Sequence, residues 1–217
     1  ALNPQNLTIE AWIKADKFTS PYNMIVSKWG FYSSTGYYLA IYNGKLLFKE
    51  SLELEIKRIV SIFIEKTKEK EIQIVSHFDT DGITSATIMI RTLKNLDRKF
   101  NLKIIKNLDE DFIKTLQKNK IIVFLDLASG SLDYLKNSGL EDIFIIDHHE
   151  IIQEIPKNVK IINPQLHEKQ KISSAGLTYL FSKEIDPENK KFAKLAVLGM
   201  VGDRLEKEIE KLNNGIL

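Results

Sequence analysis

The sequence predicts an α/β protein, with a doubly wound, parallel, five-stranded sheet preceded by a short β-rich segment. From Glu71 onward, continuous β-branched runs alternate with runs of helical periodicity, which is typical of a parallel sheet with crossover helices on both faces. The composition before residue 51 is different, because both tryptophans and five of the seven tyrosines lie there in short segments between turn residues. This change predicts a β-rich fragment at 1–50 and an α/β domain at 51–217.

The elements can be predicted in chain order. The first segment is expected to contain strands joined by hairpin turns, since the pair Asn43-Gly44 favours a tight two-residue turn. Apolar residues then recur at helical spacing across 52–70. Farther along, Gly139 ends one helix and Pro164 stops the last strand. The predicted strands of the sheet are 71–78, 102–108, 120–127, 142–149 and 159–164, and the predicted helices between and after them are 83–96, 110–117, 131–138, 173–185 and 188–203.

Composition limits the class of protein and the kinds of site. The chain has 217 residues, 43% hydrophobic and 28% charged, which suits one or two globular domains. A formal net charge of +2 does not by itself indicate a polyanionic partner, although a local basic groove is compatible with it. The absence of cysteine excludes disulfides and Cys-ligated zinc and favours a reducing, cytoplasmic location. No apolar run is long enough to span a bilayer, so we expect no membrane insertion.

Ionisable side chains gather where three of the predicted strands end. They are Asp79 and Asp81 after the first strand, Asp126 at the end of the third, and Asp147, His148 and His149 at the end of the fourth. In an open parallel sheet the carboxyl ends of the strands meet at one edge, where ligands bind. Carboxylates crowded there raise one another's pKa unless cations neutralise them. Because oxygen ligands mixed with imidazole suit Mn²⁺, Mg²⁺ or Fe²⁺, the pattern predicts a site for a pair of metal ions.

Taken singly, most of these residues also have an ordinary structural explanation. An Asp-x-Asp pair is most often a turn or a helix cap, and Asp126 can simply order the turn that follows it. The adjacent histidines are harder to explain in this way, since a strand directs successive side chains to opposite faces and only a strand end lets both converge. Asp203 follows an apolar helix, where its charge is unfavourable with the helix dipole, and this marks it as a further candidate.

Several motifs resemble those of a known family. The stretches HFDTDG, FLDLASG, IDHHE with INP, SSAGL and LGMVGD are similar, in order and rough spacing, to the successive motifs of the DHH phosphoesterase superfamily, which is named for the triplet that stands here as Asp147-His148-His149. The resemblance covers about 51–204 and is strongest to archaeal RecJ-like exonucleases. It implies a two-metal enzyme, usually dependent on Mn²⁺ with Mg²⁺ as the alternative, that hydrolyses phosphodiesters in single-stranded nucleic acid or short oligonucleotides.

The resemblance also implies which residues hold the metal ions. Asp79 and Asp126 would bind the first ion, with His77 as a third ligand. Asp126 would bridge the two ions, which lets them share and activate one water. The ligands of the second ion would be Asp81, Asp126, His148 and Asp203.

Other residues would contact the substrate or position its ligands. His149 would face the substrate phosphate, while Asp147 would accept a hydrogen bond from a histidine ring and fix its direction. Ser173 and Ser174 begin a helix whose free N–H groups could bind a phosphate. Simple N-capping explains the same two serines equally well.

The two ends of the chain depart from the family pattern. Relatives carry a C-terminal substrate-binding domain after a linker, and because the chain ends at Leu217 we expect that domain to be absent. The sequence leaves open whether the chain is active without it. Residues 1–50 resemble instead the opening strands of concanavalin-like laminin-G domains, and a natural fusion, a chimaeric sequence and an engineered join all stay open for this segment.

Two other functions stay open beside carbohydrate binding through residues 1–50, which is weakly supported because a partial sandwich leaves exposed edges. FDTDGIT also approximates the start of haloacid dehalogenase-type phosphatases, in which Asp79 would be the nucleophile and Asp81 the general acid, but this leaves the Asp-His-His triplet unexplained. The second is a catalytically silent, metal-binding scaffold of a replication or repair complex, which would have a replication-complex protein as its partner. The intact set of ligands argues against the scaffold, and the expected absence of the C-terminal domain argues for it.

Overall fold

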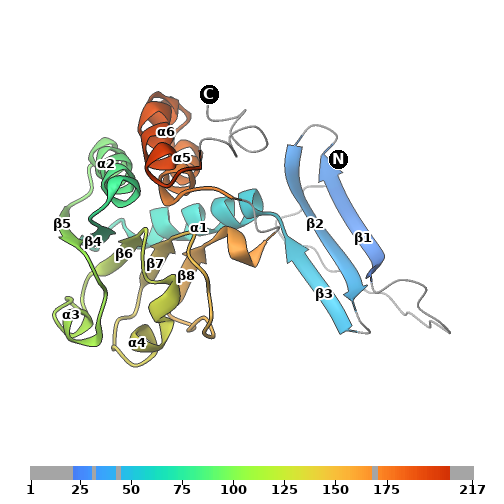
Figure 1. Ribbon diagram of the computed structural model, residues 1–217, viewed down its shortest axis with the longest axis horizontal. Coiled ribbons are helices and arrows are strands. Elements are labelled where there is room, and N and C mark those ends of the chain that lie inside the picture. The colour runs from blue at the N-terminus through green and yellow to red at the C-terminus, as the bar shows by residue number, and fades with distance from the viewer. Residues whose placement is uncertain (1–21, 31–32, 43–44, 168–170, 206–217) are drawn as a thin grey trace.

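The computed structural model describes residues 22–30, 33–42, 45–167 and 171–205, with side chains from residue 51 onward. Within these residues the chain forms two sheets, one antiparallel with three strands and one parallel with five (Figure 1). The parallel sheet and the β-rich segment before it confirm the predicted fold class. Among the helices of the described residues, none is both long and apolar enough to span a bilayer.

The antiparallel sheet lies in the first 50 residues. Strands β1 (Tyr22–Gly30), β2 (Ser33–Tyr42) and β3 (Lys45–Glu50) pair in chain order. The turn predicted at Asn43-Gly44 lies outside the described residues. The division of the chain into two domains near residue 50, and the likeness of the first segment to laminin-G domains, stay predictions.

The parallel sheet has the strand order β5-β4-β6-β7-β8. Its strands are β4 (Ile72–His77), β5 (Phe100–Ile105), β6 (Ile121–Leu125), β7 (Ile143–Ile146) and β8 (Val159–Ile162). The chain moves to one side of β4 to form β5 and then continues on the other side with β6. This reversal puts the topological switch point, where such sheets bind ligands, between β4 and β6.

Helices cover both faces of this sheet. Helices α1 (Leu52–Lys66), α2 (Thr80–Asn95) and α5 (Ser174–Ile185) form a core with one face. The short helices α3 (Glu110–Lys114) and α4 (Leu132–Lys136) form a second core with the other. Successive strand residues alternate between the two cores, as a pleated strand requires, and the arrangement is doubly wound as predicted.

The helix bounds differ from the predicted ones most informatively in three places, and the helices predicted at 110–117 and 131–138 are also shorter, at Glu110–Lys114 and Leu132–Lys136. The helix expected over 52–70 ends at Lys66, because the following residues turn into β4. The helix expected from residue 83 begins at Thr80, because the side chain of Asp79 caps it. The last predicted helix is divided into a 3-10 segment, Pro187–Phe192, and α6 (Ala193–Gly202).

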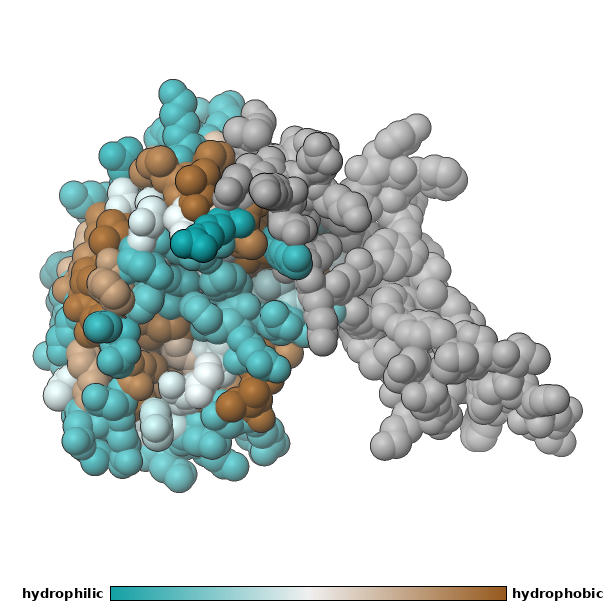
Figure 2. Space-filling view, in the orientation of Figure 1, coloured by the Kyte–Doolittle hydropathy of each residue, from teal (hydrophilic) through white to brown (hydrophobic). Residues whose placement is uncertain are grey.

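Helix α6 forms an outer layer against α2 and α5 (Figure 1). Hydrophobic surface is visible over α6 and along the edge strand β5 (Figure 2). The exposed large apolar residues there are Leu198 and Val201 on α6, and Leu102 and Ile104 on β5. By contrast β4, β6 and β7 are buried along almost their whole length, so the strand ends that carry the predicted site are rigidly held.

Candidate metal centre

The ionisable residues that end the strands lie together at the carboxyl edge of the parallel sheet. Asp79 follows β4, Asp126 follows β6 and Asp147 follows β7, three strands that are neighbours in the sheet, and Asp203 comes from the end of α6. Carboxylate oxygens and imidazole nitrogens approach within 4.8 Å of one another in three overlapping groups, each large enough to hold a metal ion. The groups are His77-Asp79-Asp126, Asp81-His148-Asp203 and Asp126-His148-His149.

The first group surrounds the end of β4. Nδ1 of His77 lies 2.9 Å from Oδ2 of Asp79 and 3.5 Å from Oδ2 of Asp126. Asp79 uses its other oxygen to accept a hydrogen bond of 3.0 Å from the N–H of Gly82, which caps α2. Burial by itself raises the pKa of Asp79, but the bond from Gly82 and the neighbouring His77 outweigh it and lower the pKa. Asp79 is therefore a helix cap and a candidate ligand at once, since each role uses a different oxygen.

The second group joins α2, the strand β7 and α6. Nε2 of His148 lies 3.0 Å from Oδ2 of Asp203 and 4.0 Å from Oδ2 of Asp81. The same nitrogen is 3.5 Å from Oδ1 of Asp126, so Asp126 faces both groups. Burial lowers the pKa of His148, but the bond to Asp203 and the charge of Asp81 raise it above its ordinary value. The site therefore favours a positive charge at this position, which a metal ion or a proton can supply.

Asp126 is the least satisfied residue of the centre. Its φ of 59° lies in the left-handed region, and it is 2% exposed. Neither carboxylate oxygen has a hydrogen-bond partner among the described residues. Burial, together with the carboxylates of Asp81 and Asp79, raises the pKa of Asp126 to about 10. Unpartnered buried oxygens and a strained backbone are costly, and a divalent cation would satisfy both oxygens, so this environment fits a metal ion.

Asp81 is completely buried against the N-terminus of α5. Its Oδ2 accepts a hydrogen bond of 2.7 Å from the N–H of Ser174, and its Oδ1 accepts one of 2.9 Å from the N–H of Ala175. Ser173 caps the helix, with its Oγ accepting from the N–H of Gly176 at 3.2 Å. A phosphate at this helix end would have to displace Asp81, so capping is the interaction present. Phosphate binding by Ser173 and Ser174 stays a prediction.

Asp147 organises the triplet that it begins. It is completely buried, and its Oδ1 lies 2.7 Å from Nδ1 of His149 and accepts from the N–H of His148 at 2.8 Å. Its Oδ2 accepts from the N–H of Ser129 at 2.9 Å. Burial by itself raises the pKa of Asp147, but these bonds outweigh it, and the pKa is lowered overall. The same contact with Asp147 raises the pKa of His149. The His149 side chain stays 55% exposed and is accessible from solvent.

Sequence reasoning assigns no role to two residues that support the centre. The completely buried amide of Asn163 donates to Oγ of Ser129 and to the carbonyl of His149, both at 2.9 Å. Gly199 lets α6 pack closely against α2, because a Cβ at this position would lie 2.5 Å from Oδ1 of Asp81. Both residues stand in quoted motifs, INP and LGMVGD, but neither a buried amide nor a close approach is visible in a single sequence.

Comparison with known sequences identifies related proteins. The model of the DHH family, N-terminal domain, matches residues 71–200. The uncharacterised protein MJ0831 of Methanocaldococcus jannaschii is 27% identical over 176 residues, which are 75% of this chain and 40% of that protein. A Bacillus subtilis protein named as an SPbeta prophage-derived single-strand DNA-specific exonuclease, YorK, is 29% identical over 140 residues, 58% of this chain and 24% of its own length. The chain thus spans less than half the length of either relative.

The fold is also found in a solved structure. The crystal structure of exonuclease RecJ bound to manganese has a TM-score of 0.64 and 18% sequence identity, covering 74% of this chain and 46% of that one. This similarity shows the fold of the parallel sheet and its helices. The side-chain groups at the carboxyl edge are the independent observation that supports a divalent metal ion in this chain.

Proposed function

This chain belongs to the DHH family, and we propose that it hydrolyses phosphodiesters with two divalent metal ions, Mn²⁺ foremost. The substrate we propose is single-stranded nucleic acid or a short oligonucleotide. Two relatives support this choice, since YorK is named as a single-strand DNA-specific exonuclease and RecJ, an exonuclease, was crystallised with manganese. Membership of the DHH family also sets aside the haloacid dehalogenase alternative.

The environment of Asp126 carries the proposal. Its two unpartnered, buried oxygens face different groups of ligand atoms, so one carboxylate can serve two ions. When bound, the ions would neutralise the crowded carboxylates, lower the pKa of a bound water and stabilise the charge that develops on the phosphate. We assign His77, Asp79 and Asp126 to the first ion, and Asp81, Asp126, His148 and Asp203 to the second.

Asp147 and His149 are proposed to act on the substrate phosphate. The bond to Asp147 is the main reason that the pKa of His149 is raised. A protonated, half-exposed imidazole can donate a hydrogen bond to a phosphate oxygen as negative charge builds there. Asp147 is the positioning residue in this scheme, because it fixes the direction of the ring.

The test is Mn²⁺-dependent release of nucleotides from 5′-labelled single-stranded DNA and from a short RNA, with Asp126→Asn as the variant. We expect cleavage by the parent chain that disappears in the variant, together with loss of Mn²⁺ binding measured by calorimetry. A parent chain that binds Mn²⁺ and cleaves neither strand would overturn the hydrolase proposal and favour the metal-binding scaffold. A parent chain that binds no metal would overturn both.

A further inference from the structure

Phe78 is an exposed aromatic residue within the candidate metal centre. It stands between the candidate ligands His77 and Asp79, and it is 47% exposed. Its ring centroid lies 4.8 Å from that of His77, with the two rings at 77° to each other. A large apolar side chain is thus held at the rim of a strongly charged site, open to solvent.

A cation lies beside the same ring. Lys106 follows β5, whose last residue, Ile105, pairs with His77 in the neighbouring strand. Its Nζ is 6.0 Å from the centroid of the Phe78 ring, and the side chain is exposed. Within the part of the chain that the structure describes, no ion pair joins Lys106 to a carboxylate. The rim therefore offers an aromatic face and a flexible positive charge next to each other.

Helix stability explains only part of this arrangement. Phe78 and Ile83 occupy the positions just before the cap and in the first turn of α2 that form a hydrophobic staple in many helices. Both stay about half exposed, at 47% and 48%. A leucine would serve such a staple as well as a phenylalanine does. The staple accounts for an apolar residue at this position, but not for an aromatic ring beside a cation.

We propose, on the basis of the function proposed above, that Phe78 stacks against the base of the nucleotide at the metal centre while Lys106 binds a neighbouring phosphate. Proteins that bind single-stranded nucleic acid combine aromatic faces for the bases with cations for the backbone. Inorganic pyrophosphate or polyphosphate offers nothing to stack. The substrate class is therefore a strand of nucleotides with its bases accessible, and Phe78 is a residue that selects it.

Binding without turnover tests the stacking directly. The full chain, with Ca²⁺ in place of Mn²⁺, is titrated with a single-stranded DNA that carries 2-aminopurine near its 5′ end and with an abasic strand of equal length and charge. We expect Phe78→Leu to weaken binding of the base-bearing strand about tenfold, the loss of one stacked base, and to leave the abasic strand unchanged. Phe78→Trp should restore binding. Tyr134→Ala, which removes an aromatic side chain that is 44% exposed on α4, should alter neither strand.

The outcomes separate this inference from the hydrolase proposal. If the parent chain binds the two strands equally, or if Phe78→Leu weakens both alike, the inference is overturned whatever the cleavage assay gives. If base-dependent binding is lost in Phe78→Leu although the parent cleaves nothing, the inference stands and the hydrolase proposal fails. Thermal unfolding is the structural control: an unchanged Tm in Phe78→Leu is expected, and a fall in Tm that matches the loss of binding would assign the residue to the staple alone.

Discussion

A buried aspartate lies at the carboxyl edge of the parallel sheet, where the strands end, and another lies at the amino edge, where they begin. The two differ in whether the chain supplies a cation as their partner. Asp126 at the carboxyl edge has no hydrogen-bond partner for its oxygens, and its pKa is raised to about 10. Asp142 at the amino edge, just before β7, is 3% exposed and binds two lysines closely, with Nζ of Lys66 at 2.8 Å and Nζ of Lys70 at 3.0 Å, while Nζ of a third, Lys160, lies 3.9 Å away. Burial raises the pKa of Asp142, but the bonds from these lysines outweigh it and lower the pKa.

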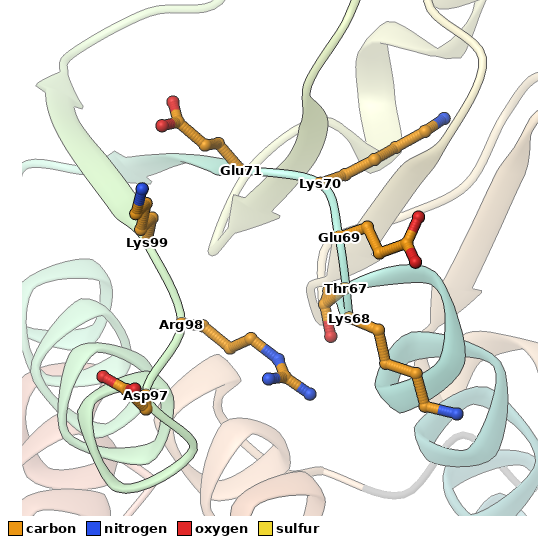
Figure 3. A pocket seen from close by; sticks show the side chains of 8 residues that line it. All are labelled: Thr67, Lys68, Glu69, Lys70, Glu71, Asp97, Arg98 and Lys99. Atoms are coloured by element: carbon orange, nitrogen blue, oxygen red, sulfur yellow. The ribbon is translucent and has the colours of Figure 1, made fainter.

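The amino edge also has a pocket of about 360 Å³ between the loops that lead into β4 and β5 (Figure 3). Apart from Thr67, its lining residues are charged, and both signs are present: Lys68, Glu69, Lys70, Glu71, Asp97, Arg98 and Lys99. None of the predicted site residues is among them. Burial of an acid therefore does not by itself mark a functional site. Asp142 is neutralised by lysines of the chain, whereas the oxygens of Asp126 have no partner among the described residues and can bind a metal ion.

Asp126→Asn should have the largest effect on catalysis. We expect the rate of Mn²⁺-dependent cleavage to fall about a thousandfold, because several kcal/mol of transition-state stabilisation depend on the bound ions. The free energy of unfolding in EDTA at neutral pH should rise, because a carboxyl whose pKa is raised to about 10 must take up a proton when the parent folds, whereas asparagine is neutral in both states. Cleavage rates and urea unfolding measure the two quantities. A marked loss of stability without metal would contradict this account.

Gly199→Ala should show that the carboxyl edge depends on the close approach of α6. The added Cβ would lie 2.5 Å from Oδ1 of Asp81 and 2.6 Å from Oγ1 of Thr84, so we expect the free energy of unfolding to fall by about 1–3 kcal/mol and Mn²⁺ binding to weaken. Gly130→Ala is the matched control, because a Cβ there meets nothing within 4 Å. Calorimetric titration and urea unfolding check both variants, and equal behaviour of the two would refute the steric argument.

Asp147→Asn should reduce the cleavage rate about 10- to 100-fold, the usual cost of removing a group that orients a residue of the site. Since the bond to Asp147 is the main cause of the raised pKa of His149, this pKa should fall toward its ordinary value in the variant. An NMR titration of the His149 ring measures the shift. An unchanged pKa with reduced cleavage would assign Asp147 a different role.

Asp142→Asn should have the smallest effect and leave the metal centre intact. The side chains of Lys66 and Lys70 are 43% and 42% exposed and can return to water, so we expect a loss of about 1–2 kcal/mol in the free energy of unfolding. Because the pKa of Asp142 is lowered by folding, its contribution is present above the ordinary carboxyl pKa of about 4 and is lost as the pH falls through the folded value.

Urea unfolding of the parent and of Asp142→Asn as a function of pH tests that sign. The two stabilities should differ at neutral pH and converge in acid. Mn²⁺ binding should be the same in both at neutral pH, which contrasts with Asp126→Asn. A difference that grows in acid would show that the lysines do not favour the charged form of Asp142.

Much of the fold could be predicted because local patterns carry it. Buried strands such as Ile121–Leu125 are continuous apolar runs, and α2 shows its periodicity over four turns. The crowding of acids and histidines at one edge also follows from the sequence, since parallel strands must bring their carboxyl ends together. Helix ends were less predictable: α2 begins at Thr80 because Asp79, read also as a possible ligand, caps it.

The sequence alone determined the α/β class and the set of candidate ligands, because residue type and periodicity act over a few neighbouring positions. Only the tertiary structure decided which partners those residues have. The N–H of Ser174 reaches Asp81 across 93 residues of chain, and the amide of Asn163 reaches Ser129 across 34. These bonds exist only after α5 has packed on α2 and β8 has paired with β7. Asp126 is left without such a bond, and that is visible only when the positions of all its neighbours are known.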